Sequence, residues 1–163
     1  MNFFPLLFIV LCSLSMLTGC NMAAPAPQKT SLELQAIQAR EFETDKKTAF
    51  NSTMSVFQDL GYIVNSASYE TGFITAQSPV KTGADLWGMH VPDGIMKSTK
   101  ATAFVEEIRP GHAKVRLNFV NMVEQTQNEG QRIVEDTAVE QPEAYQNAFT
   151  KIQEAIFIRS ATK

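Results

Sequence analysis

The sequence predicts an α+β two-layer sandwich, in which an antiparallel sheet of four to six strands carries two helices on one face. Two segments, 45–60 and 142–156, repeat apolar residues at the three- and four-residue spacing of an amphipathic helix. Between them lie segments that alternate apolar and polar residues and are separated by glycine turns, as in antiparallel sheets. The predicted order of elements is therefore β-α-β-β-β-β-(β)-α.

The beginning of the domain predicts a strand followed by a helix. Residues 35–44 are expected to form the first strand, with Ile37 and Ala39 among its apolar positions. Thr44-Asp45 then offers an N-cap, and Gly61 ends the helix because glycine readily adopts the left-handed conformation found there. We expect the apolar stripe of this helix to pack in the core rather than to bind a ligand; it comprises Ala49, Phe50, Met54, Val56, Phe57 and Leu60.

Two hairpins are expected next. The first turns at Gly72, and the second turns at Pro110-Gly111, the residues that a type II turn favours at its central positions. In the last strand Val115 and Leu117 alternate with charged and amide residues, so one face of the sheet is expected to face the core and the other water. The four strands are 62–68, 72–77, 99–108 and 113–123.

The C-terminal part is expected to contain a loop, a short edge strand and the second helix. Residues 124–129 are polar and predict a loop, while 131–134 can add a short edge strand. Pro142 lies in the first turn of the last helix, where its missing N–H is harmless. The apolar face of this helix consists of Tyr145, Ala148, Phe149, Ile152, Ala155 and Ile156.

The N-terminus has the pattern of a targeting signal. An apolar run of about 15 residues, shorter than the roughly 20 that a spanning helix needs, ends at Leu17-Thr18-Gly19-Cys20. These four residues resemble the lipobox of bacterial lipoproteins, which implies cleavage before Cys20 and acylation of its thiol. The alternative is an N-terminal transmembrane helix that ends in a core cysteine. The predicted organisation is a signal peptide over 1–19, an acylated cysteine and tether over 20–31, and one domain over 32–163.

The mature chain that this cleavage would leave has no disulfide, because Cys12 lies in the signal and residues 21–163 contain no cysteine. Asn21 follows the acylated residue where inner-membrane lipoproteins commonly have aspartate, so the resemblance implies an outer-membrane anchor with the domain in the periplasm. Segments 38–44, 58–64 and 145–157 resemble small Gram-negative lipoproteins, which implies a location and no reaction. The element order is also similar to the helix-grip domains of BamC-type lipoproteins.

Few residues suggest chemistry. The net charge of −3 and the scattered basic residues argue against nucleic-acid binding. Glu106 and Glu107 are adjacent on a predicted strand, so their side chains point to opposite faces and cannot act as an acid–base pair. His112 is expected to be an exposed turn residue. The sequence thus suggests no catalytic residue, and we expect neither a metal nor another cofactor.

The segment 79–97 is long for a connection within a compact domain, and such connections are often functional. It holds the single Trp of the chain, and the expected partner-binding residues are Leu86, Trp87, Met89 and His90. One alternative is that Trp87 folds back to cap the sheet or the core. Another is a metal site formed by His90 with Asp85 or Asp93.

Taken together, these patterns suggest a lipid-anchored, non-catalytic accessory or binding component of a cell-envelope assembly. Its expected partners are the membrane, through the acyl chains on Cys20, and an envelope protein. The first alternative is a carrier or sensor of a small apolar ligand, which a buried apolar cavity would favour. The second is a hydrolase whose site is assembled from residues far apart in the sequence.

Overall fold

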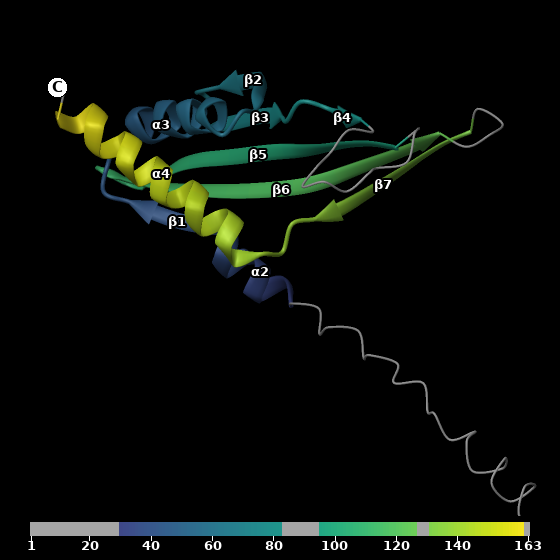
Figure 1. Ribbon diagram of the computed structural model, residues 1–163. Coiled ribbons are helices and arrows are strands. Elements are labelled where there is room, and N and C mark those ends of the chain that lie inside the picture. Colours follow the sequence, from purple (N-terminus) through teal and green to yellow (C-terminus); the bar gives the residue numbers. More distant parts are fainter. Residues whose placement is uncertain (1–29, 83–94, 127–130, 162–163) are drawn as a thin grey trace, which may run out of the picture.

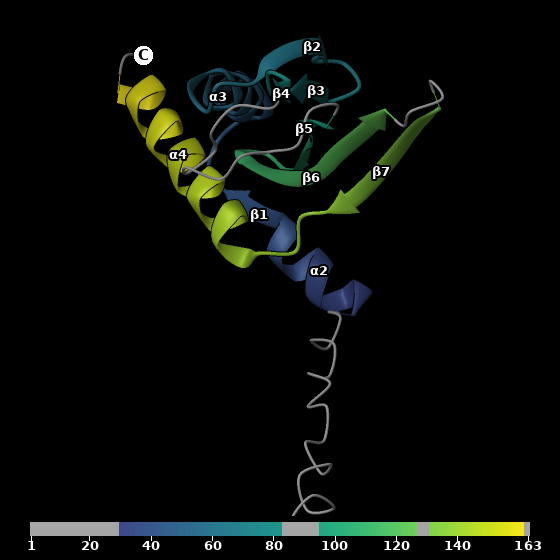
Figure 2. The same cartoon turned by 45° about the vertical axis from the view of Figure 1, so that its right-hand side comes forward.

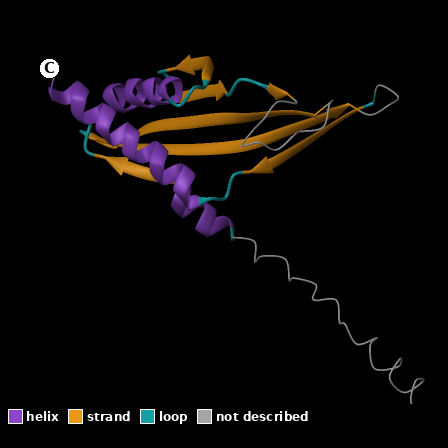
Figure 3. Cartoon of the chain, viewed as in Figure 1, coloured by secondary structure: helices purple, strands orange, loops and turns teal. Residues whose placement is uncertain are grey.

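The computed structural model describes residues 30–82, 95–126 and 131–161. Its described strands form one antiparallel sheet, and helices α3 and α4 pack together on one face of it (Figures 1 and 3). The predicted α+β class is therefore confirmed. In chain order the elements are α2 (Ser31–Gln38), β1 (Ala39–Phe42), α3 (Lys46–Asp59), β2 (Ile63–Ser68), β3 (Phe73–Gln77), β4 (Lys81–Thr82), β5 (Ile95–Arg109), β6 (His112–Thr126), β7 (Arg132–Ala138) and α4 (Pro142–Ala161).

The hairpin of β5 and β6 forms the centre of the sheet. Its strands have 15 residues each and pair from Ile95 opposite Gln125 to Arg109 opposite His112. The sheet order is β1-β6-β5-β3-β2, with β4 beside β5 and β7 beside β6. Along β6, β1 pairs with residues 113–116 and β7 with residues 120–126, so these two short strands lie at opposite ends of the same edge.

The central hairpin has a covered half and an uncovered half. The core half, residues 101–109 and 112–119, buries alternate side chains under α3 and α4, on what we call the helix face. The arm consists of residues 95–100, residues 120–126 and β7. None of the arm residues is fully buried, and β7 is exposed along its whole length. Figures 1 and 2 show the arm extending beyond α3 and α4.

The core forms where the predicted helices meet small sheet residues. Helix α3 begins at Asp45, whose carboxylate accepts the Thr48 backbone N–H at 2.8 Å, and it ends before Gly61 at φ 83°. Ala101, Ala103 and Ala113 let the helices approach the sheet closely. The large side chains that are almost completely buried are Phe42, Val56, Phe57, Ile74, Val105, Val115, Leu117, Tyr145, Phe149 and Ile152.

Both predicted turns are confirmed, but several element limits differ from prediction; for example, the strand expected over 99–108 already begins at Ile95. Gly72 and Gly111 have φ of 79° and 74°. The expected strand over 35–44 is wrong at its start, because residues up to Gln38 belong to α2, which begins with a Thr30–Glu33 capping box. The predicted loop 124–129 is wrong for its first three residues, which continue β6. The sheet has seven strands rather than four to six, since β4 and a full-length β7 join it.

Candidate functional site

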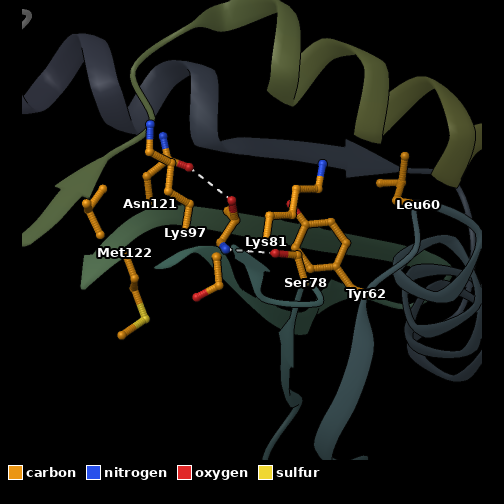
Figure 4. Close-up of a pocket in the computed structure, with 10 residues that line it drawn as sticks. Leu60, Tyr62, Ser78, Lys81, Lys97, Asn121 and Met122 are labelled. Carbon is orange, nitrogen blue, oxygen red and sulfur yellow. Dashed lines mark hydrogen bonds between the residues drawn. The ribbon is translucent and has the colours of Figure 1, made fainter. Parts of the chain in front are cut away.

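A groove opens on the helix face where the core half meets the arm (Figure 4). It lies between the end of α3 and the strand residues of the arm, and it is open to solvent. Its volume is about 480 Å³. The lining residues are Leu60, Tyr62, Ser78, Lys81, Lys97, Ser98, Thr99, Asn121, Met122 and Val123.

The groove continues toward the start of α4 as a second hollow of about 350 Å³. The two hollows share four lining residues, so they form one continuous depression; the shared residues are Leu60, Tyr62, Thr99 and Asn121. The second hollow adds the apolar side chains of Phe119, Val139 and Ala144, together with Asn147. We call the part at the arm, which carries both lysines, the polar half of the groove, and the uncharged part at α4, which adds these three apolar side chains, the apolar half.

Tyr62 lies between the two halves. Its ring centroid is 5.9 Å from that of Phe57 and 6.2 Å from that of Phe119, so aromatic packing fixes the phenol at the edge of the core. Burial raises the pKa of Tyr62 above its usual value of 10.0. The hydroxyl is therefore protonated at neutral pH and makes no hydrogen bond to another described residue.

The polar half contains two lysines from neighbouring strands. Lys81 in β4 and Lys97 in β5 are direct partners in the antiparallel register, and both are exposed. Directly opposed like charges destabilise a strand pair. Among the described residues no carboxylate lies within ion-pair distance of either ammonium group; the salt bridge of the arm joins Arg132 Nε to Glu124 at 3.4 Å.

Hydroxyl and amide groups between the lysines and Tyr62 form some of their hydrogen bonds with one another. Thr99 donates from its backbone N–H to Ser78 Oγ at 2.8 Å and from its hydroxyl to Asn121 Oδ1 at 3.0 Å. Both bonds are drawn in Figure 4. The Asn121 amide NH₂ has no partner among the described residues. The polar half thus presents two ammonium groups, one phenol and one amide as available donors.

None of the site residues predicted from the sequence lies within the described part of the chain. Leu86, Trp87, Met89 and His90 lie outside the described residues, as do Cys20, Asp85 and Asp93. The residues that flank segment 83–94 are described. Thr82 of β4 pairs with Met96 of β5, which belongs to the arm.

Two other sequence features have a described position. Glu106 and Glu107 are successive residues of β5, opposite Lys114 and Ala113 respectively, and they follow the expected alternation of a strand. His112 Nδ1 is 3.3 Å from the guanidinium of Arg109, across the hairpin turn. In residues 30–82, 95–126 and 131–161, no three His, Cys, Asp or Glu side chains are grouped to hold a metal ion.

Sequence reasoning missed the lysine pair, because its geometry depends on the register between β4 and β5. The signal that was available is that Lys81 and Lys97 stand near the two ends of the long segment 79–97. A segment whose ends pair in antiparallel fashion places such residues opposite each other.

Fold and groove define a small α+β domain with an open surface site of mixed polarity. No helix within the described ranges is long and apolar enough to cross a membrane. No family model matches the chain, and no curated protein matches it. Among solved structures, it is similar to a crystal structure of a DUF4468 family protein from Bacteroides ovatus, with 9% sequence identity and a TM-score of 0.38. The similarity covers 79% of this chain and 96% of that one and assigns no activity.

Proposed function

We propose that this protein is a lipid-anchored, non-catalytic accessory or binding component of a cell-envelope assembly, held in the outer membrane through Cys20 with its domain in the periplasm. The anchor and its location rest on the resemblance of Leu17-Thr18-Gly19-Cys20 to a lipobox. The binding role rests on the arm.

The observation that carries the binding role is the exposed edge strand β7. It pairs with β6 on one side, and no described strand pairs with its other side. Ile133 and Val134 are 42% and 51% exposed, and alternation places them on opposite faces of the strand. An exposed edge offers backbone N–H and C=O groups to an extended segment of a partner, while apolar side chains on its faces add contact area.

The segment with the predicted partner-binding residues is attached to the same region. The segment follows Thr82 of β4, which pairs with β5 of the arm, and the chain enters the arm itself at Ile95. Strand β4 pairs with β5 and β7 pairs with β6, so this segment is tethered at the edge opposite to β7. A partner that binds along β7 and extends across the hairpin therefore reaches the edge to which Trp87 and its neighbours are tethered. We propose that Leu86, Trp87, Met89 and His90 contribute to this contact.

The test is site-specific photocrosslinking in intact envelopes. A benzophenone amino acid replaces Val134 in the arm, and a matched variant carries it at Phe73, which is 54% exposed on β3. We expect the Val134 probe to yield one defined envelope-protein adduct, and we expect Trp87→Ala to weaken it. The adduct should also require acylation, so the Cys20→Ala chain should not form it.

Identical adduct patterns from the two probes would show random collision and contradict a binding role for the arm. Adduct formation that is unchanged by Cys20→Ala would contradict the anchor while leaving the arm as the binding surface. The two parts of the proposal can thus fail separately.

The groove supports a second candidate function, the binding of a small ligand. An enclosed apolar cavity would suit the apolar ligand suggested by the sequence, but the described groove is open and half polar. A lining of this mixed polarity suits a ligand that has a polar part as well as an apolar one.

A further inference from the structure

We infer that the groove binds the phosphate ester of an amphiphile, with the phosphate between Lys81 and Lys97 and the apolar part beside Phe119. This inference concerns described residues only and does not depend on the lipid anchor or on a partner at β7.

The charge of the two lysines favours an anionic ligand. The register places two positively charged residues opposite each other on the same face, without a described carboxylate in ion-pair contact with either. An anion between the ammonium groups replaces their repulsion by two attractive contacts. Glu135 is the neighbouring carboxylate on the helix face, opposite Val123, and it makes no ion pair with either lysine. Glu124, on the outer face, is occupied by Arg132.

The number and type of donors favour phosphate over carboxylate. Lys81, Lys97, the Tyr62 hydroxyl and the Asn121 amide surround the same polar half of the groove (Figure 4). A phosphate monoester carries between one and two negative charges at neutral pH and three acceptor oxygens besides the ester oxygen. A carboxylate carries one charge and two oxygens, so it would use fewer of these donors.

The apolar half supplies the second part of the ligand. Phe119, Val139 and Ala144 line the hollow that adjoins Tyr62 and Thr99. A molecule whose phosphate lies at the lysines can therefore extend an alkyl chain along the groove toward α4. Burial of that chain removes methylene groups from water and therefore favours binding.

The experiment titrates the full-length chain, purified in a nonionic detergent, with dihexanoyl phosphatidic acid and follows the backbone NMR signals. Glycerol 3-phosphate tests a soluble phosphate ester, and dihexanoylglycerol tests the apolar part alone. We expect shifts at groove residues and the tightest binding for phosphatidic acid. Lys81→Gln/Lys97→Gln should weaken it at least tenfold, whereas Lys47→Gln/Lys100→Gln, which removes two exposed charges away from the groove, should change it less than twofold.

A third variant tests the apolar half. Ala144 is exposed in the first part of α4, so Ala144→Glu leaves the core intact. It should weaken phosphatidic acid binding about tenfold and have little effect on glycerol 3-phosphate. Equal affinity for the two phosphates would overturn the amphiphile and favour a soluble ester. Equal affinity for dihexanoylglycerol would overturn the phosphate site. Hexaglutamate tests an acidic polypeptide, and if it bound as tightly as phosphatidic acid, the phosphate site would likewise be overturned.

Folding of the lysine variant can be checked independently. Without ligand at low salt, Lys97→Gln removes the repulsion with Lys81, so its midpoint of thermal unfolding should equal or exceed that of the wild type. A lower midpoint would contradict the proposed charge strain. Val134 crosslinking should be the same in this variant, which separates the groove from the role proposed for the arm.

Discussion

The core half and the arm are built from the same two strands, with the same antiparallel pairing, yet they differ in what covers them. Val115 in the core half is fully buried beneath the helices, whereas Val123, eight residues further along the same face of β6, is only partly buried. Backbone pairing alone therefore maintains the geometry of a strand, and the helices decide which part becomes a core. The arm keeps its backbone regular and leaves its side chains available for binding.

The largest effect should follow from changing the backbone where the first hairpin meets the core half. Gly72 has φ 79°, and a Cβ there would strike the Val105 carbonyl oxygen. Gly72→Ala should therefore lower the free energy of unfolding by about 3–5 kcal/mol. At Gly111, with φ 74°, nothing lies within 4 Å, so Gly111→Ala should cost about 1 kcal/mol. Urea unfolding measures both, and equal losses would contradict the clash.

A matched pair of valines tests the comparison directly. Val115→Ala should lower the free energy of unfolding by about 2–3 kcal/mol, because it removes buried methyl groups and leaves a cavity. Val123→Ala should cost less than about 1 kcal/mol, since its site is open to water. Comparable losses in denaturant titrations would show that the arm is packed as firmly as the core half.

The junction of the two regions depends on one hydroxyl. Tyr145 Oη donates to the Val139 carbonyl oxygen at 2.8 Å, where the chain passes from β7 to α4. Tyr145→Phe should lower stability by about 1–2 kcal/mol and speed amide exchange in β7 more than in β3. Tyr69→Phe serves as the control, because Tyr69 is 48% exposed and its ring contacts are kept. Uniform acceleration across the sheet would argue against a local junction.

The dependence of the free energy of unfolding on pH in the alkaline range tests the state of Tyr62. Its pKa is raised by burial, so above the unfolded value the folded state holds the proton more tightly and stability falls as the pH rises. Tyr62→Phe should make this fall shallower between about pH 9 and pH 11. A slope equal to that of the wild type would contradict the assigned shift.

The smallest effect is expected at the arm surface. Arg132 and Glu124 form a salt bridge at 3.4 Å, in which the side chain of Arg132 is largely exposed and that of Glu124 is partly exposed. Arg132→Gln should change the free energy of unfolding by less than about 0.5 kcal/mol, and added salt should abolish the difference. A loss above about 1 kcal/mol would mean that the arm contributes to stability as the core half does.

The sequence was sufficient where periodicity and turn chemistry act locally. Helix α3 follows from its apolar stripe between Asp45 and Gly61, and α4 from Pro142 and the stripe after it. The start of α2 was missed, although Thr30 and Glu33 have the spacing of a capping box.

The arm and the groove depend on contacts that local pattern does not encode. Residues 124–126 were predicted as a loop because no face is buried there, and pairing with β5 and β7 makes them a strand. Strand β4 has only two residues, so its existence depends on β5. The hydrogen-bond donors of the groove belong to Tyr62, Lys81, Lys97 and Asn121. Their spacing along the chain does not predict that they lie in one groove.

The position of β1 has a consequence for the order in which the chain folds. Strands β5, β6 and β7 are consecutive and can pair through short loops, whereas pairing Ala39 with Arg116 closes a loop of roughly 75 residues. Helix α3 likewise rests on strands that follow it in the sequence, and α4 completes the core with Phe149 and Ile152. During synthesis, which proceeds from the N-terminus, the chain must therefore keep its early apolar segments exposed until the last helix is made.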